Sequence, residues 1–119
     1  MELKKELIEL IENAEFTVSN NGNCFYEFGK FSPANHDFSF TINAGNDMSE
    51  FLHNIYTYYD DFDVSGEAYL WLDNFGHGKN GAPHDMKDVY EDFEICREYI
   101  DELYKIVNGY MDSKGEEND

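Results

Sequence analysis

The first apolar residues of the chain recur at the spacing of a helix. Large aliphatic side chains lie three and four residues apart, which places them on one face. Charged residues fill the intervening positions, including Lys5 and Glu9, which are four residues apart on the opposite face. The pattern predicts an amphipathic helix over residues 2–13. Its apolar positions are Leu3, Leu7, Leu10 and Ile11.

Three short runs with the spacing of β-strands follow this helix. They cover residues 16–19, 24–28 and 38–42, and the last alternates strictly between apolar and polar side chains. An Asn-Asn-Gly-Asn sequence, a strong turn signal, separates the first two runs, and residues 29–37 connect the second run to the third. The runs therefore predict a three-stranded antiparallel meander.

The second half of the chain returns to helical spacing. Asp47 and Glu50 form the start of a capping box, and the apolar stripe that follows predicts a helix that reaches Phe62. We expect Ser65 to cap the next element, but residues 66–73 fit either a short helix or a buried strand. A long loop, rich in glycine, follows.

The last element has the longest regular pattern. Apolar residues recur at spacings of three and four, as in a heptad seam, and Gly109 is the expected end of this helix. Such a seam fits packing on the protein's own sheet, which favours a monomer, and a homodimer is the alternative. The seam consists of Met86, Val89, Phe93, Cys96, Ile100, Leu103 and Val107.

Together these elements predict an α+β fold: an N-terminal helix, a three-stranded antiparallel sheet, then two or three helices packed on one face. The length of 119 residues fits one domain, which we expect over residues 1–110, followed by a disordered acidic tail at 111–119. Aromatic residues make up 17% of the chain and supply a core despite the high charge, which argues against disorder.

The charge of the chain excludes several classes of function. Asp and Glu number 26 against 8 Lys and Arg, for a formal net charge of -18. Direct binding to DNA, RNA or an anionic membrane is disfavoured, since affinity for phosphates comes largely from basic side chains. No apolar run approaches the roughly 20 residues that cross a bilayer. Cys24 and Cys96 lie far apart without metal-finger spacing, so we expect reduced thiols and a cytoplasmic location.

Two acidic clusters are the main candidates for a binding site. One lies on the last helix, where a helical wheel places acids opposite the apolar seam, and the other follows a group of tyrosines. Such a surface suits a basic groove on another protein. The alternative is a solvated face that only aids solubility. The expected partner-binding residues are Asp60, Asp61, Asp63, Asp88, Glu91, Asp92, Glu98, Asp101 and Glu102.

Histidine and aspartate residues in the loops form a candidate metal site. Three or four of them could converge as nitrogen and oxygen ligands of a structural Zn²⁺, and the alternative is that the histidines face solvent. Residues 61–67 match the first half of a calcium loop, but Leu72 stands where that loop needs a bidentate Glu, so a turn between helices is expected there. The candidate zinc ligands are Asp37, Asp73, His77, His84 and Asp85.

Common catalytic patterns are missing from the sequence. It contains no GxSxG sequence, no P-loop and no Rossmann glycine pattern. Paired carboxylates are plentiful, but in so acidic a chain their pairing carries no information. We therefore expect the protein not to be an enzyme. A metal-dependent enzyme built on the loop histidines is the rival interpretation.

Three segments of the chain resemble a known group of proteins. FGKFSP at 28–33, YLWLD at 69–73 and HGKNGAP at 77–83 are similar to small acidic proteins of mobile genetic elements in gut Firmicutes, some of which resemble anti-CRISPR proteins. The resemblance implies a stoichiometric inhibitor that binds a type II effector nuclease and blocks DNA loading or cleavage. Its acids would either act as a DNA mimic in geometry or only supply an electrostatic field. The alternatives are an immunity protein or antitoxin that neutralises a basic nuclease toxin, and a small metal-binding protein.

Overall fold

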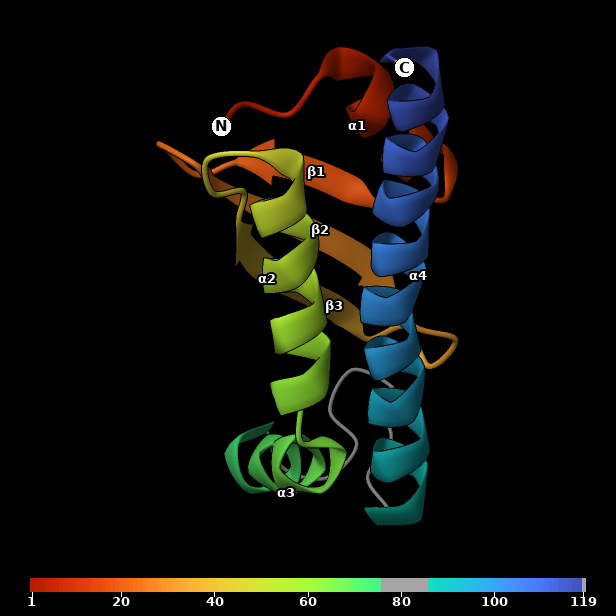
Figure 1. Cartoon of the computed structure of the whole chain (residues 1–119). Helices are drawn as coiled ribbons and strands as arrows, with labels where there is room; N and C mark the ends of the chain where they lie inside the picture. The colour runs from red at the N-terminus through yellow and green to blue at the C-terminus, as the bar shows by residue number, and fades with distance from the viewer. Residues whose placement is uncertain (76–85, 119) are drawn as a thin grey trace.

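The computed structural model describes residues 1–75 and 86–118, and over these residues it has the α+β fold that the sequence predicts (Figure 1). A helix comes first, three antiparallel strands follow, and the remaining described segments are helices. The elements are α1 (Lys5–Asn13), β1 (Thr17–Asn20), β2 (Phe25–Phe31), β3 (Asp37–Asn43), α2 (Met48–Asp61), α3 (Val64–Phe75) and α4 (Met86–Asn118).

The sheet is the predicted antiparallel meander, in the order β1-β2-β3. Its register pairs Val18 with Phe28 and Phe28 with Phe40. Because side chains alternate along a strand, this register gathers the apolar side chains of all three strands on one face. The opposite face is polar apart from Phe25 and Phe31, which are exposed. Only one face of the sheet therefore contributes to the core.

Helices α2 and α4 run side by side across this apolar face, as Figure 1 shows. Phe51 of α2 stacks on Phe28 of the sheet, with ring centroids 6.3 Å apart. The heptad seam predicted for the last helix is buried within the chain itself. Its buried members are Val89, Phe93, Cys96, Ile100, Leu103 and Val107.

Helix α3 lies across the end of α2 and α4 (Figure 1) and packs on α4. It includes residues 66–73, so the helical alternative for this segment is the correct one. The helix begins at Val64, before Ser65, and the expected cap at Ser65 is therefore wrong. Since α2 ends at Asp61 and α3 begins at Val64, the half-match to a calcium loop spans the expected turn between two helices and the first turn of α3.

The start of α2 confirms the capping pattern read from the sequence. The side chain of Asp47 accepts a hydrogen bond of 2.8 Å from the backbone N–H of Glu50, and the Glu50 carboxylate accepts one of 3.0 Å from the N–H of Asn46. Helix α1 begins at Lys5, later than predicted, because no capping side chain precedes it. Leu3 is nevertheless buried.

Lys30 of the central strand β2 joins three elements. Its ammonium group donates hydrogen bonds of 2.8 Å to the backbone oxygen of Ala14 and to the Glu102 carboxylate of α4. The same group lies 4.9 Å and 4.8 Å from the ring centroids of Phe16 and Tyr99. A cation so enclosed neutralises one acid of α4 and links it to β2 and the end of α1.

Helix α4 continues past Gly109 to Asn118, so the predicted end at Gly109 is wrong. Val107 and Tyr110 are buried on either side of the glycine, and the Tyr110 hydroxyl donates a hydrogen bond of 2.8 Å to Glu6 of α1. Tertiary contacts thus carry the helix through a residue of poor helix propensity. Helix α4 also covers residues 111–118.

We expect Gly109→Ala to raise the free energy of unfolding by about 0.5–1 kcal/mol, because alanine favours a helix interior and a Cβ at this position meets nothing within 4 Å. Urea denaturation measures the change. Gly29→Ala is the contrasting variant, since its Cβ would lie 2.7 Å from Thr17 Oγ1, and it should destabilise. A destabilising Gly109→Ala would instead indicate that the helix ends at this residue.

Candidate metal centre and acidic groove

Three side chains from two distant segments meet beside the aromatic core. His36 comes from the connection between β2 and β3, and Asp92 and Cys96 come from α4. The Nδ1 atom of His36 lies 3.0 Å from Asp92 Oδ2 and 3.9 Å from Cys96 Sγ. All three ligand atoms lie within 4.8 Å of one another. This histidine–aspartate–cysteine group could therefore hold a metal ion.

The connection between β2 and β3 positions the His36 ring. The Ser32 hydroxyl accepts a hydrogen bond of 3.1 Å from the His36 backbone N–H, and the Ser32 N–H donates one of 2.9 Å to the His36 oxygen. Asn35 adopts the left-handed conformation, with φ of 66°, which asparagine tolerates. The His36 ring then packs edge-on against Phe93 and Trp71, with centroids 5.0 Å and 6.0 Å away.

Asp92 is buried, with 6% of its side chain exposed, and is not part of the acidic surface. The prediction that it binds a partner on that surface is therefore wrong. The physical reason is periodicity: Asp92 lies three residues after Val89 and four before Cys96, so it falls within the buried stripe. Its Oδ1 atom has no hydrogen-bond partner among the described residues, an arrangement that costs about 1–3 kcal/mol.

The thiol of Cys96 is not activated as a nucleophile. Burial and the nearby Asp92 carboxylate raise the pKa of Cys96 to about 12, so the sulfur stays protonated at neutral pH. Both the carboxylate and the sulfur approach the same ring nitrogen of His36. A proton relay of the cysteine–histidine–acid type needs both ring nitrogens. The geometry thus suits metal ligation better than nucleophilic attack.

The metal ligands predicted from the sequence are not the residues of this group. Asp37 is exposed at the start of β3. The Asp73 side chain, His77, His84 and Asp85 lie outside the described residues. His36 and Cys96 were not among the predicted ligands. The sequence does contain a signal for part of this group, because Asp92 lies four residues before Cys96 within the apolar stripe of the last helix.

One acid from each predicted cluster, Asp63 and Glu98, lines a groove of about 350 Å³ between α4 and the turn that joins α2 to α3. We call it the acidic groove. Asp63 lines it from the turn, and Glu94 and Glu98 line it from α4. Glu94 was not among the predicted residues, although its position on the exposed face of the helix could have identified it. The lining also includes Tyr59, Tyr90 and Arg97.

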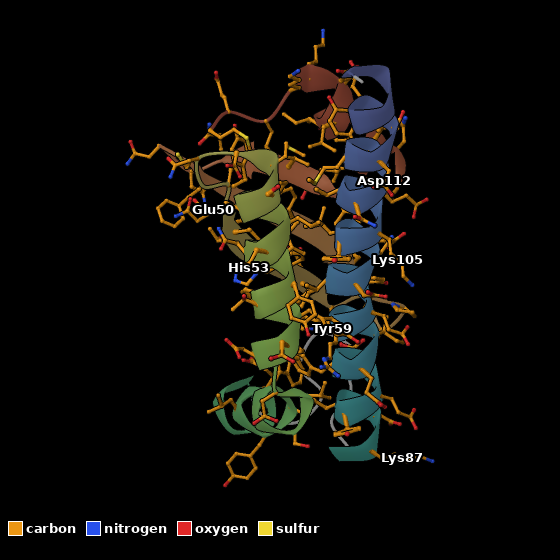
Figure 2. All side chains as sticks on the ribbon, in the orientation of Figure 1. Glu50, His53, Tyr59, Lys87, Lys105 and Asp112 are labelled. Atoms are coloured by element: carbon orange, nitrogen blue, oxygen red, sulfur yellow. The ribbon has the colours of Figure 1, made fainter. Side chains whose placement is uncertain are left out.

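Arg97 is held by α2 and does not neutralise the acidic groove by direct pairing. Its Nε–H donates a hydrogen bond of 3.2 Å to the Tyr59 backbone oxygen, and its guanidinium carbon lies 4.2 Å from the Tyr59 ring centroid. Figure 2 shows Tyr59 between α2 and α4. Among the side chains that the structure describes, no ion pair joins Arg97 to an acid. Three carboxylates therefore share the groove with one engaged cation.

The remaining acids of the predicted surface fall into two groups. Asp101 pairs with Lys105 at 3.0 Å, and Glu102 pairs with Lys30 at 2.8 Å, so basic side chains of the protein itself offset these charges. The others are exposed, and Asp61 lines a second groove of about 390 Å³ beside β3. The exposed acids are Asp60, Asp61, Asp88 and Glu91.

No family model, curated protein or solved structure matches the chain. Among the described residues, no helix is both long enough and apolar enough to cross a membrane.

We expect Cys96 to react slowly with a soluble disulfide reagent in the folded, metal-free protein. A Cys24→Ser variant leaves Cys96 as the sole thiol, because the chain has 2 Cys. At pH 8 its reaction should be about 1,000-fold slower than that of free cysteine, since the buried sulfur is protonated. Denaturant should remove the difference. Rapid reaction of the folded variant would contradict the buried placement, and Cys96→Ser measures the half-buried Cys24 for comparison.

Proposed function

We propose that this protein binds a basic, nucleic-acid-binding surface of another protein and thereby excludes the nucleic acid. The observation that carries this proposal is the acidic groove, which Asp63, Glu94 and Glu98 line together with one cation, Arg97, that is engaged by Tyr59. A lysine or arginine side chain of a partner can enter such a groove and pair with its carboxylates. Tyr90 also lines the groove and is exposed, so its ring can offer an arginine a further contact.

The exposed acids around the groove support the same proposal. Glu91, Glu94 and Glu98 follow one another at spacings of three and four on the exposed side of α4, about 5–6 Å apart, comparable to the phosphates of one nucleic-acid strand. The net charge of -18 attracts a basic partner from a distance. The molecule is also elongated, with extents of 53 × 25 × 24 Å, a shape that suits a nucleic-acid channel.

The partner that we propose is a type II CRISPR effector nuclease. The resemblance of residues 28–33, 69–73 and 77–83 implies this partner. Its guide–target heteroduplex lies in a positively charged channel, which is the kind of surface that an acidic groove and its surrounding carboxylates would complement. Binding would block DNA loading or cleavage at a stoichiometric ratio.

DNA cleavage by a guide-loaded type II effector, with the protein titrated in at two salt concentrations, tests this proposal. Inhibition should occur near an equimolar ratio and weaken as salt rises, because exposed charges are screened over about 8 Å at physiological ionic strength. The double variant Glu94→Lys/Glu98→Lys should weaken inhibition at least about 10-fold, equivalent to about 1.4 kcal/mol. Folded wild-type protein that fails to inhibit at excess would contradict this partner.

A matched control separates the acidic groove from net charge. Glu9→Lys/Glu12→Lys makes the same change of charge on exposed residues of α1, at the opposite end of the molecule from α3 (Figure 1). This control should inhibit nearly as well as the wild type. Equal losses in both double variants would show that only net charge matters, and no loss in either would show that the groove is not the docking surface.

A further inference from the structure

We propose that His36, Asp92 and Cys96 bind a zinc ion, at a site separate from the acidic groove. Zinc ligands lie about 2.0–2.3 Å from the ion at tetrahedral angles, which places two ligand atoms about 3.3–3.6 Å apart. The distances from His36 Nδ1, 3.0 Å to the carboxylate and 3.9 Å to the sulfur, lie on either side of that range. The carboxylate and the sulfur lie within 4.8 Å of one another, so side-chain shifts of up to about 1 Å would bring the three atoms to a common ion.

A second, independent observation is the unpartnered oxygen of Asp92. This carboxylate is 6% exposed, and its Oδ1 atom has no hydrogen-bond partner among the described residues. Buried carboxylates are normally paired, hydrogen-bonded or bound to a metal. A cation held by both oxygens of this carboxylate would satisfy the free Oδ1 atom and offset the negative charge that Asp92 places beside the sulfur.

The charges of such a site balance. When the ion binds, the Cys96 thiol gives up its proton to solvent and ligates as a thiolate. Neutral His36 ligates through the Nδ1 lone pair, with its ring proton on Nε2, and Asp92 ligates as a carboxylate. One thiolate, one carboxylate and one Zn²⁺ have a net charge of zero, which suits a site that is mostly buried.

The ligand types select the class of metal. A thiolate together with an imidazole suits zinc, whereas magnesium and calcium prefer oxygen ligands alone. The His36 side chain is 17% exposed, so the site reaches solvent and water can fill a fourth position. The ion would tie the connection between β2 and β3 to α4, which is a structural role.

Titration of the metal-free full chain with Zn²⁺ and with Co²⁺, each alone, tests this site. One equivalent of Zn²⁺ should raise the melting temperature, because the ion binds the folded state. Co²⁺ should produce a sulfur-to-cobalt charge-transfer band in the near ultraviolet, which only thiolate ligation generates. The Cys24→Ser variant should keep the band, and in that variant it can arise only from Cys96, since the chain has 2 Cys.

Substitutions of the ligands complete the test. Cys96→Ser should abolish the band, and Asp92→Asn should weaken Co²⁺ binding at least about 10-fold while the band persists at saturation. His53→Gln alters an exposed histidine of α2 (Figure 2) and should bind as the wild type does. Absence of the band in Cys24→Ser, or unchanged binding in Asp92→Asn, would overturn the proposal. Both variants retain Cys96, so the test stands even if Cys96→Ser fails to fold.

Discussion

Burial of one face of α4 is the constraint on which the rest of the structure depends. This helix packs on α1, α2 and α3, and its apolar stripe covers the sheet. Because successive residues of a helix are about 100° apart, fixing the buried stripe also fixes the direction of every other side chain. Asp92 and Glu94 are two residues apart, as are Cys96 and Glu98, so they point to nearly opposite sides. A single packing arrangement therefore defines both the histidine–aspartate–cysteine group and the acidic groove.

Local patterns were sufficient to predict most of the fold. Strict alternation over residues 38–42 specifies a strand with one buried face, and Asp47 with Glu50 specifies a helix start, whatever lies elsewhere in the chain. The pattern of apolar residues did not predict element type or helix ends where tertiary contacts determine them. Helix α3 buries Ala68 while Tyr69 and Leu70 are exposed, so its apolar run has no clear period, and α4 passes through Gly109 because of its contact with α1.

The candidate sites were less predictable because they depend on contacts between distant residues. His36 and Asp92 are 56 residues apart in sequence, and no local pattern pairs them. The helical wheel placed Asp92 opposite the apolar seam, although its spacing of three residues from Val89 and four from Cys96 puts it in the buried stripe. The exposure of most acids could be predicted because charged side chains favour the surface. That Asp63 and Glu94 line the same groove depends on how the turn after α2 packs against α4.

The folded state uses several of its few cations internally. Lys30, Arg97 and Lys105 contact Glu102, Tyr59 and Asp101 respectively, which leaves most exposed acids without a basic partner among the residues that the structure describes. Self-repulsion among those acids destabilises the folded state, and an apolar core must offset it. A partner's basic surface would relieve the same repulsion on binding. Salt should therefore act in opposite directions: screening stabilises the isolated protein but weakens the proposed complex.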